Sequence, residues 1–177
     1  MTAHGYTITK EFHFAASHTL HELPADHKCS NMHGHNYIVK IVLQAPALDH
    51  RGFVVDYGEL SPIKKWIDDE LDHAHLAATE SEAEIVYSAM KSLRGKDFEQ
   101  RTHVIGANTS AENLARYIYR RWKDDFPALR EVWVSETPKT WAVYRDLVIR
   151  QNSYLDFALV NETAVILSEE THGDKSG

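Results

Sequence analysis

Two stretches that alternate between apolar and polar side chains, joined by a loop that contains histidines, constrain the fold of this chain most. Residues 6–15 place tyrosine, isoleucine and two phenylalanines on one parity, and residues 37–43 (YIVKIVL) are rich in β-branched side chains. Alternation with a period of two residues is typical of strands. Residues 21–36 contain proline, aspartate, asparagine and glycine, which favour turns. The pattern therefore predicts two neighbouring strands joined by a loop.

Helical periodicity follows the second strand. A first amphipathic helix is predicted to begin at Asp56, because Glu59 follows three residues later as in a capping box, and to end near residue 71. A second helix is predicted to begin at Thr109 or Ser110 and to end before a proline at position 127. Further strands are expected at residues 131–135 (EVWVS) and 141–144 (WAVY).

The order strand, strand, helix, helix, strand, strand indicates an α+β domain. We expect a four-stranded antiparallel sheet with two main helices on one face. The chain has 177 residues and shows neither an internal repeat nor a Gly/Ser-rich linker, so a single domain spanning residues 1–177 is expected.

Two segments fall outside this plan. Residues 77–108 form an insertion between the helices, longer than a simple connection requires. A short additional helix is expected there, because Ser81 and Glu84 resemble a capping box and Gly95 can end a helix. These signals are local, so we expect the insertion to be peripheral. Residues 151–177 form a C-terminal extension with one apolar stretch and a polar end.

Composition and charge exclude several classes of function. The net charge is −7 with neutral histidines and no basic block is present, so binding of nucleic acid through its phosphates is disfavoured. No apolar run approaches the ~20 residues of a membrane span, and the polar N-terminus does not resemble a signal peptide. A cytoplasmic protein is therefore expected. The single cysteine, Cys29, cannot form an intramolecular disulfide, which fits a reducing compartment.

Histidine is the residue type that points to a site. The chain has 12 histidines, and two of them form the triplet His33-Gly34-His35. Residues two apart on extended backbone point to the same side, so both imidazoles can reach one metal ion. His18 lies at the end of the first strand and reaches the same place if the strands pair. Three neutral imidazoles with one open position predict a catalytic Zn²⁺ site, and the alternative is a set of solvated histidines at strand ends.

Cys29 lies four residues before His33, and its position admits three roles. It could be a fourth zinc ligand, a base or nucleophile whose pKa falls beside a metal, or a small buried hydrophobe. Lys28 could assist it or bind a substrate phosphate, and the alternative for Lys28 is a solvated loop charge.

Carboxylates complete the set of candidates. Asp72 precedes His73 and could fix its tautomer and raise its basicity if the side chains converge. The alternative is a histidine favoured by the dipole at a helix C-terminus. Glu136 follows the strand at residues 131–135 and could bind a two-donor face such as an amino-pyrimidinone edge. We assign Glu112 to a capping box with Thr109.

Six sequence motifs follow one another along the chain. They are residues 12–18 (FHFAASH), 27–35 (HKCSNMHGH), 52–60 (GFVVDYGEL), 71–76 (LDHAHL), 108–115 (NTSAENLA) and 135–145 (SETPKTWAVYR). In this order they resemble the 6-pyruvoyltetrahydropterin synthase and 6-carboxytetrahydropterin synthase family. The resemblance covers most of residues 12–145 and leaves out residues 77–104.

The resemblance implies a fold, an assembly and a substrate. The fold is the tunnelling fold, in which antiparallel sheets of several subunits join into a barrel and two rings stack. The usual assembly is a homohexamer, a dimer of trimers, with active sites at subunit interfaces. The small-molecule substrate is 7,8-dihydroneopterin triphosphate, a pterin triphosphate.

The same resemblance implies roles for individual residues. By position, the zinc ligands are His18, His33 and His35, the proton-abstracting base is Cys29, the relay pair is Asp72 and His73, and the pterin anchor is Glu136. Further substrate contacts are assigned to Lys28, Thr109, Ser110 and Thr137.

Two branches of the family differ in their product. In the pyruvoyl branch triphosphate leaves and the side chain is oxidised internally. In the carboxy branch the side chain is also cleaved, acetaldehyde is lost, and 6-carboxy-5,6,7,8-tetrahydropterin is left for 7-deazapurine (queuosine) biosynthesis. The spacing Cys-x-x-x-His-Gly-His and the preceding His27-Lys28 resemble the carboxy branch.

Three other functions stay open. One is a 6-pyruvoyltetrahydropterin synthase. Another is a zinc hydrolase that uses metal-bound hydroxide, which would leave Cys29 and Glu136 without a role. The third is a non-catalytic pterin- or metal-binding paralogue.

Overall fold

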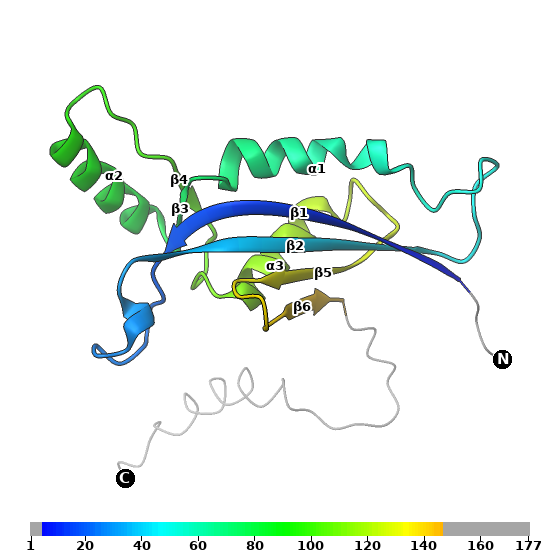
Figure 1. The fold of residues 1–177 in the computed structure, drawn as a ribbon, viewed down its shortest axis with the longest axis horizontal. Coiled ribbons are helices and arrows are strands. Elements are labelled where there is room, and N and C mark those ends of the chain that lie inside the picture. Colours follow the sequence, from blue (N-terminus) through cyan, green and yellow to red (C-terminus); the bar gives the residue numbers. More distant parts are fainter. Residues whose placement is uncertain (1–4, 147–177) are drawn as a thin grey trace, which may run out of the picture. The chain divides into compact units, whose positions relative to one another are not determined.

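A computed structural model of the chain describes residues 5–146, which form a curled six-stranded sheet and three α-helices (Figure 1). The strand order in the sheet is β4-β3-β1-β2-β5-β6. The strands are β1 (Tyr6–His18), β2 (His33–Ala45), β3 (His75–Ala77), β4 (Thr102–Val104), β5 (Leu129–Ser135) and β6 (Ala142–Arg145). The helices are α1 (Ser61–Trp66), α2 (Glu80–Arg94) and α3 (Ala111–Trp122). The predicted C-terminal extension lies outside the described residues.

Strands β1 and β2 form the long hairpin on which the site is built. Both are 13 residues long and pair antiparallel from end to end, so the two predicted strands are confirmed and extended. Alternate residues face the core, and the rings of Phe14 and Tyr37 stack across the pair with centroids 4.9 Å apart. The loop between them, with a 3₁₀ turn at Lys28–Ser30, lies where β1 ends and β2 begins.

Helices α1 and α3 cover the face of the sheet that carries this alternation. Their buried side chains, among them Ile63 and Leu114, join one hydrophobic cluster with Phe12, Phe14 and Val39. The prediction of two main helices on one face is therefore confirmed. Helix α1 follows a 3₁₀ turn capped by Asp56 and continues into a π-helical turn, Ile67–Leu71.

The prediction of a four-stranded antiparallel sheet is wrong in the number and direction of strands. Strands β3 and β4 extend the sheet beyond β1, and both pair parallel to their neighbours. They have three residues each, too few for a period of two to show in the sequence. Strand β4 lies within residues 77–108, so this insertion takes part in the sheet.

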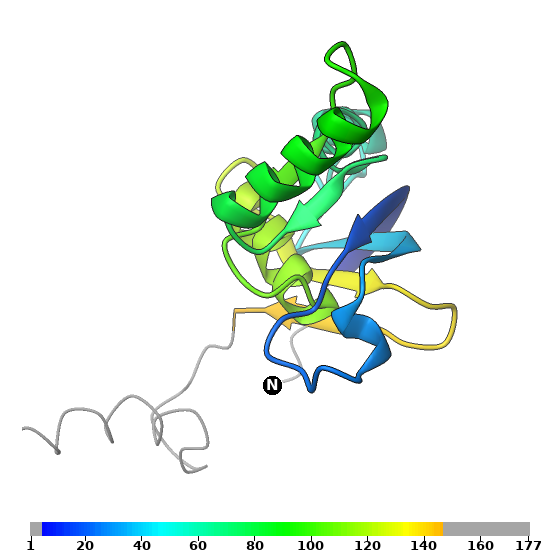
Figure 2. The same cartoon turned by 90° about the vertical axis from the view of Figure 1, so that its left-hand side faces the viewer.

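The inserted helix was predicted at the right place, although it is not short. Helix α2 has 15 residues, and its N-cap is Thr79, whose side chain accepts from the backbone of Glu82, rather than Ser81. Gly95 ends it with φ 104°, as expected. Figure 2 shows α2 beside β3 and β4 at the edge of the sheet. Within residues 5–146, no helix has both the length and the apolar character needed to cross a bilayer.

Candidate metal centre and active site

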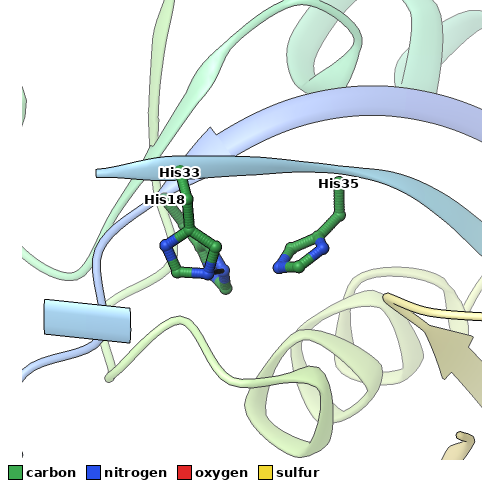
Figure 3. Close-up of side chains that lie close together, drawn as sticks. All are labelled: His18, His33 and His35. Carbon is green, nitrogen blue, oxygen red and sulfur yellow. Dashed lines mark hydrogen bonds between the residues drawn. The ribbon is translucent and has the colours of Figure 1, made fainter. Parts of the chain in front are cut away.

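Three imidazoles converge at the end of the β1–β2 hairpin. The register pairs His18 with His33 and Ala16 with His35, so all three side chains leave the hairpin on its core-facing side (Figure 3). One ring nitrogen from each histidine lies within 4.8 Å of the others, and His18 Nε2 is 3.1 Å from His33 Nε2. The trio was predicted from the sequence, and the structure brings it together as one group that could hold a metal ion.

Hydrogen bonds determine the tautomers of two of these rings. His18 Nδ1 lies 2.9 Å from the carbonyl oxygen of Thr109, and His33 Nδ1 lies 2.8 Å from that of Asn31. A carbonyl can only accept, so both Nδ1 atoms carry a hydrogen, and in the neutral form of each ring the Nε2 atom then presents a lone pair. Two lone pairs that face each other at 3.1 Å repel unless a cation lies between them.

The pKa values of two of the three rings, His18 and His35, agree with neutral ligands. Burial lowers the pKa of His18 to about 4, with smaller contributions from His33 and His35, and outweighs the carbonyl of Thr109, which raises it. Burial and His33 also lower the pKa of His35. Neutral imidazoles with fixed outer hydrogen bonds are the donor set that zinc prefers in catalytic sites. The residues present therefore fit a zinc ion, and Cys29 is not part of the ligand group found in the described chain.

Cys29 lies in the 3₁₀ turn of the β1–β2 loop. Its backbone N–H donates to His27 Nδ1 at 3.2 Å, and its carbonyl accepts from the backbone of Leu20 at 3.0 Å. The thiol is half-buried and free. Its neighbour Lys28 is exposed. The loop is thus tied to the chain just after β1, close to His18 of the histidine trio.

Asp72 and His73 converge even though adjacent side chains often diverge. Asp72 Oδ2 lies 2.8 Å from His73 Nδ1, and its Oδ1 accepts from the backbone of Ala15 at 2.9 Å. The hydrogen bond from Ala15, and after it His73, lower the pKa of Asp72. A left-handed backbone at His73 (φ 58°) turns the chain back onto β1. Asp72 therefore holds the His73 ring with Nε2 free to exchange a proton.

The His73 side chain is 77% exposed, and no hydrogen bond joins it to the histidine trio or to Cys29 within residues 5–146. A cavity of about 380 Å³ adjoins the pair, and its lining includes Ser17, Gly34, His35 and Gln100. The structure of one chain thus assembles the histidine trio and the Asp72–His73 pair as two separate groups.

Glu136 follows β5 beside the trio. Its Oε1 atom is buried and has no hydrogen-bond partner in the part of the chain that is described. Burial, followed by the charge of Glu112, raises the pKa of Glu136, while His33 acts in the opposite direction. A buried carboxyl group without a partner in the protein is suited to a ligand.

Tyr37 is a site residue that the sequence reasoning missed. It is fully buried, its ring lies 5.6 Å from that of His35, and its hydroxyl also lacks a partner in the described chain. Burial and then the charge of Glu136 raise its pKa. It shares the parity of His33 and His35 on β2, and this parity is the signal that could have identified it.

Other residues predicted to contact the substrate form hydrogen bonds within the protein. The Thr109 hydroxyl donates to the Thr19 carbonyl at 3.1 Å, and Ser110 is the N-cap of α3. Because the cap is Ser110, the capping box assigned to Glu112 with Thr109 is wrong. Thr137 is exposed after β5, and its hydroxyl pairs with that of Thr140 at 2.7 Å.

Comparisons with known proteins agree with this arrangement. A family model described as 6-pyruvoyl tetrahydropterin synthase matches residues 7–146. A 6-carboxy-5,6,7,8-tetrahydropterin synthase of Haemophilus influenzae is 30% identical over 147 residues, which cover 80% of this chain and 99% of that relative. A 6-pyruvoyl tetrahydrobiopterin synthase of Dictyostelium discoideum is 29% identical over 123 residues, 67% of this chain and 73% of that relative.

A solved structure of an uncharacterised protein from Wolinella succinogenes has the same fold. The TM-score is 0.69 at 22% identity, and the match covers 81% of this chain and 99% of the other. The family model spans most of the chain, including the histidine trio, Asp72 and Glu136. The chain is a member of the 6-pyruvoyl tetrahydropterin synthase family.

Proposed function

We propose that this pterin synthase is a zinc-dependent lyase that converts 7,8-dihydroneopterin triphosphate to 6-carboxy-5,6,7,8-tetrahydropterin, with loss of acetaldehyde and triphosphate. Its product would enter 7-deazapurine (queuosine) biosynthesis in the cytoplasm. The observation that carries the proposal is the pair of facing Nε2 lone pairs beside a buried, unpartnered carboxyl group. The first would bind a cation and the second the polar edge of a pterin.

The substrate ring would be held by Glu136, whose free Oε1 accepts from the amino-pyrimidinone edge. Tyr37 would limit the depth to which the ring enters and would supply a hydroxyl to it. Lys28 and Thr137, both exposed near the site, are proposed to contact the more distal parts of the substrate. Such contacts fix the side chain of the substrate in register with the acid–base groups.

Cys29 is proposed to take a proton from the substrate side chain as its thiolate, and His73 to exchange a second proton through Nε2. Asp72 keeps the His73 ring in the required tautomer. Zinc held by the trio would supply Lewis-acid stabilisation of the negative charge that develops as a C–H proton leaves.

We propose that the site is completed between subunits of a homohexamer, a dimer of trimers. The support is the separation of the histidine trio from the Asp72–His73 pair, because within residues 5–146 the exposed His73 ring has no hydrogen-bond partner other than Asp72. A neighbouring subunit could then bring its Cys29 and zinc to this ring.

Turnover of 7,8-dihydroneopterin triphosphate by the zinc-loaded protein tests the proposal. We expect 6-carboxy-5,6,7,8-tetrahydropterin and acetaldehyde in equal amounts, identified by chromatography and a coupled aldehyde assay. A His33→Ala variant should retain almost no zinc and should be inactive. Full zinc occupancy in that variant would contradict the ligand assignment, and no turnover by the wild-type protein would indicate a non-catalytic pterin- or metal-binding relative.

The second candidate is a 6-pyruvoyltetrahydropterin synthase, because a 6-pyruvoyl tetrahydrobiopterin synthase is among the relatives. We favour the carboxy reaction for two reasons. Three residues separate Cys29 from His33, as in the carboxy branch, and the match to the 6-carboxy relative extends over nearly all of its length. Release of triphosphate without acetaldehyde would favour the second candidate.

A further inference from the structure

Glu82, on helix α2 of the insertion, connects three parts of the chain. Its Oε2 accepts from His21 Nε2 at 2.9 Å and from the backbone of Ala78 at 2.7 Å, and its Oε1 lies 3.4 Å from His75 Nε2. The carboxylate is 13% exposed. Burial raises the pKa of Glu82, but the bonds from Ala78 and His21 outweigh it and lower the pKa, so the group is ionised near neutral pH.

The first connection leads to Cys29. His21 lies near the start of the β1–β2 loop, and its backbone exchanges two hydrogen bonds of 3.0 Å with the side chain of Asn108. The preceding residue, Leu20, donates to the Cys29 carbonyl at 3.0 Å. The Glu82 carboxylate therefore binds the residue next to Leu20, whose backbone is hydrogen-bonded to Cys29.

The second connection leads to the zinc-bearing end of β1. His75, on β3, is 1% exposed, and its Nδ1 lies 3.0 Å from Ser17 Oγ. Ser17 immediately precedes His18 and pairs with His75 across the strands. Glu82 thus contacts His75 of β3 directly, and through His75 it is linked to Ser17 at the end of β1.

The other end of the insertion reaches the acid–base pair. Arg101 donates from Nη1 to the Asp72 carbonyl at 2.9 Å and from Nη2 to the carbonyls of Asp68 and Asp69. These carbonyls end the π-helical turn, where a cation is favoured by the dipole. Gln100, beside it, lines the cavity next to His73.

We infer that the insertion is a brace for the reacting groups, with Glu82 as the positioning residue for Cys29 and Arg101 as the positioning residue for the Asp72–His73 turn. This inference rests on the proposed function for the catalytic meaning of Cys29 and His73. It replaces the expectation that the insertion is peripheral. The side chains of Glu82 and Arg101, which make these contacts, both lie within residues 77–104, the part of the chain that the six sequence motifs leave out.

The experiment compares Glu82→Gln with Glu84→Gln in the full chain. Both substitutions remove one negative charge from α2, but Glu84 is exposed and forms no hydrogen bond or ion pair within residues 5–146. Because Cys29 is the only cysteine, its alkylation by iodoacetamide reports the state of the loop directly. We expect alkylation to accelerate by about threefold to tenfold in Glu82→Gln, since one charge-assisted hydrogen bond is lost, and to be unchanged in Glu84→Gln.

Turnover and zinc content complete the measurement. Glu82→Gln should keep full zinc, because the ligands come from β1 and β2, and should lose about tenfold in kcat with little change in KM. His21→Ala removes the same His21–Glu82 hydrogen bond by changing an exposed side chain, and it should also accelerate alkylation. This variant can therefore decide the test if Glu82→Gln does not fold. The double variant should be no faster than either single one.

Equal alkylation rates in Glu82→Gln, Glu84→Gln and the wild-type protein would overturn the brace. A change in KM alone would also count against it, because that would place Glu82 in substrate binding. If the wild-type protein does not turn over the pterin triphosphate, the proposed function fails, while alkylation still decides whether Glu82 holds the loop.

Discussion

At His18, burial and one carbonyl acceptor determine the protonation state of a histidine that could hold a metal ion. The ring is fully buried, its Nδ1 is committed to Thr109, and its pKa is about 4. The free lone pair on Nε2 is therefore present throughout the neutral range. The position of Thr109, one residue before the N-cap of α3, matters for this reason, and its hydroxyl donates to the Thr19 carbonyl and so fixes the backbone that carries the acceptor.

The low pKa of His18 makes the stability of the metal-free protein depend on pH. The pKa is about 4 in the folded state and about 6.5 in the unfolded chain, so the unfolded chain binds more protons between these values and stability falls as pH falls. This group should remove about 2 kcal/mol of unfolding free energy between pH 7 and pH 5. Urea denaturation of the EDTA-treated protein at the two pH values measures this difference in unfolding free energy. An equally large loss in His18→Gln would contradict the shift.

Cys29 can be assigned with one variant. If the thiol is a base, Cys29→Ala should keep its zinc and lose about 10²–10⁴-fold in turnover. If it is a fourth ligand, zinc binding should weaken strongly, and if it is a buried hydrophobe, both properties should survive with slightly lower stability. We expect the first result, because three histidines form the ligand group without it. Turnover near the wild-type rate would remove Cys29 from the mechanism.

At the scale of elements, the sequence predicted those helices and strands in which apolar residues recur with a regular period over many positions. The β1–β2 hairpin, α1 and α3 carry periodicity over many positions, and all were found. Strands β3 and β4 have three residues each and are held by pairing with β1 and with each other, which no local pattern reveals. The cap of α2 was misplaced by two residues because Thr79 and Ser81 are both good caps.

The same distinction separates the predictable part of the site from the rest. The histidine trio could be predicted, because His33 and His35 are two residues apart on one strand and His18 lies at the end of the strand that pairs with it. Tyr37 shares their parity but looks like a core aromatic, and Glu82 looks like a solvated helix charge. Their roles depend on long-range neighbours, such as Glu136 for Tyr37 and His21 for Glu82.

Removal of helix α2 tests the insertion as an element. Replacement of residues 81–95 by a short Gly/Ser linker should leave zinc bound, because all three ligands lie on β1 and β2. Turnover should fall at least as far as in Glu82→Gln, since the tether to His21 is lost. Zinc analysis and kcat on the same preparation check both statements. Loss of zinc would show that α2 supports the hairpin itself.

At the scale of the whole molecule, the exposed Asp72–His73 pair favours a site shared between subunits. Cys29→Ala and His73→Ala should each lower turnover by about 10²–10⁴-fold, but co-expressed mixed oligomers should recover activity at about one quarter of their sites. That recovery requires the two residues to come from different subunits. Turnover at the background of the single variants would place both residues in one chain, and a monomer by light scattering would exclude the shared site.

Within residues 5–146, the hydroxyl of Tyr37 and the Oε1 atom of Glu136 have no hydrogen-bond partner, which has a consequence for chemical screening. The free protein bears the cost of two desolvated polar atoms, and a compound that satisfies them returns that free energy as a higher melting temperature. Small bicyclic heteroaromatics with an amide–amine edge should therefore give unusually large thermal shifts for their size. Tyr37→Phe, which removes one of the unmet atoms, should melt slightly higher than the wild-type protein when no compound is present and should gain less from the same hits.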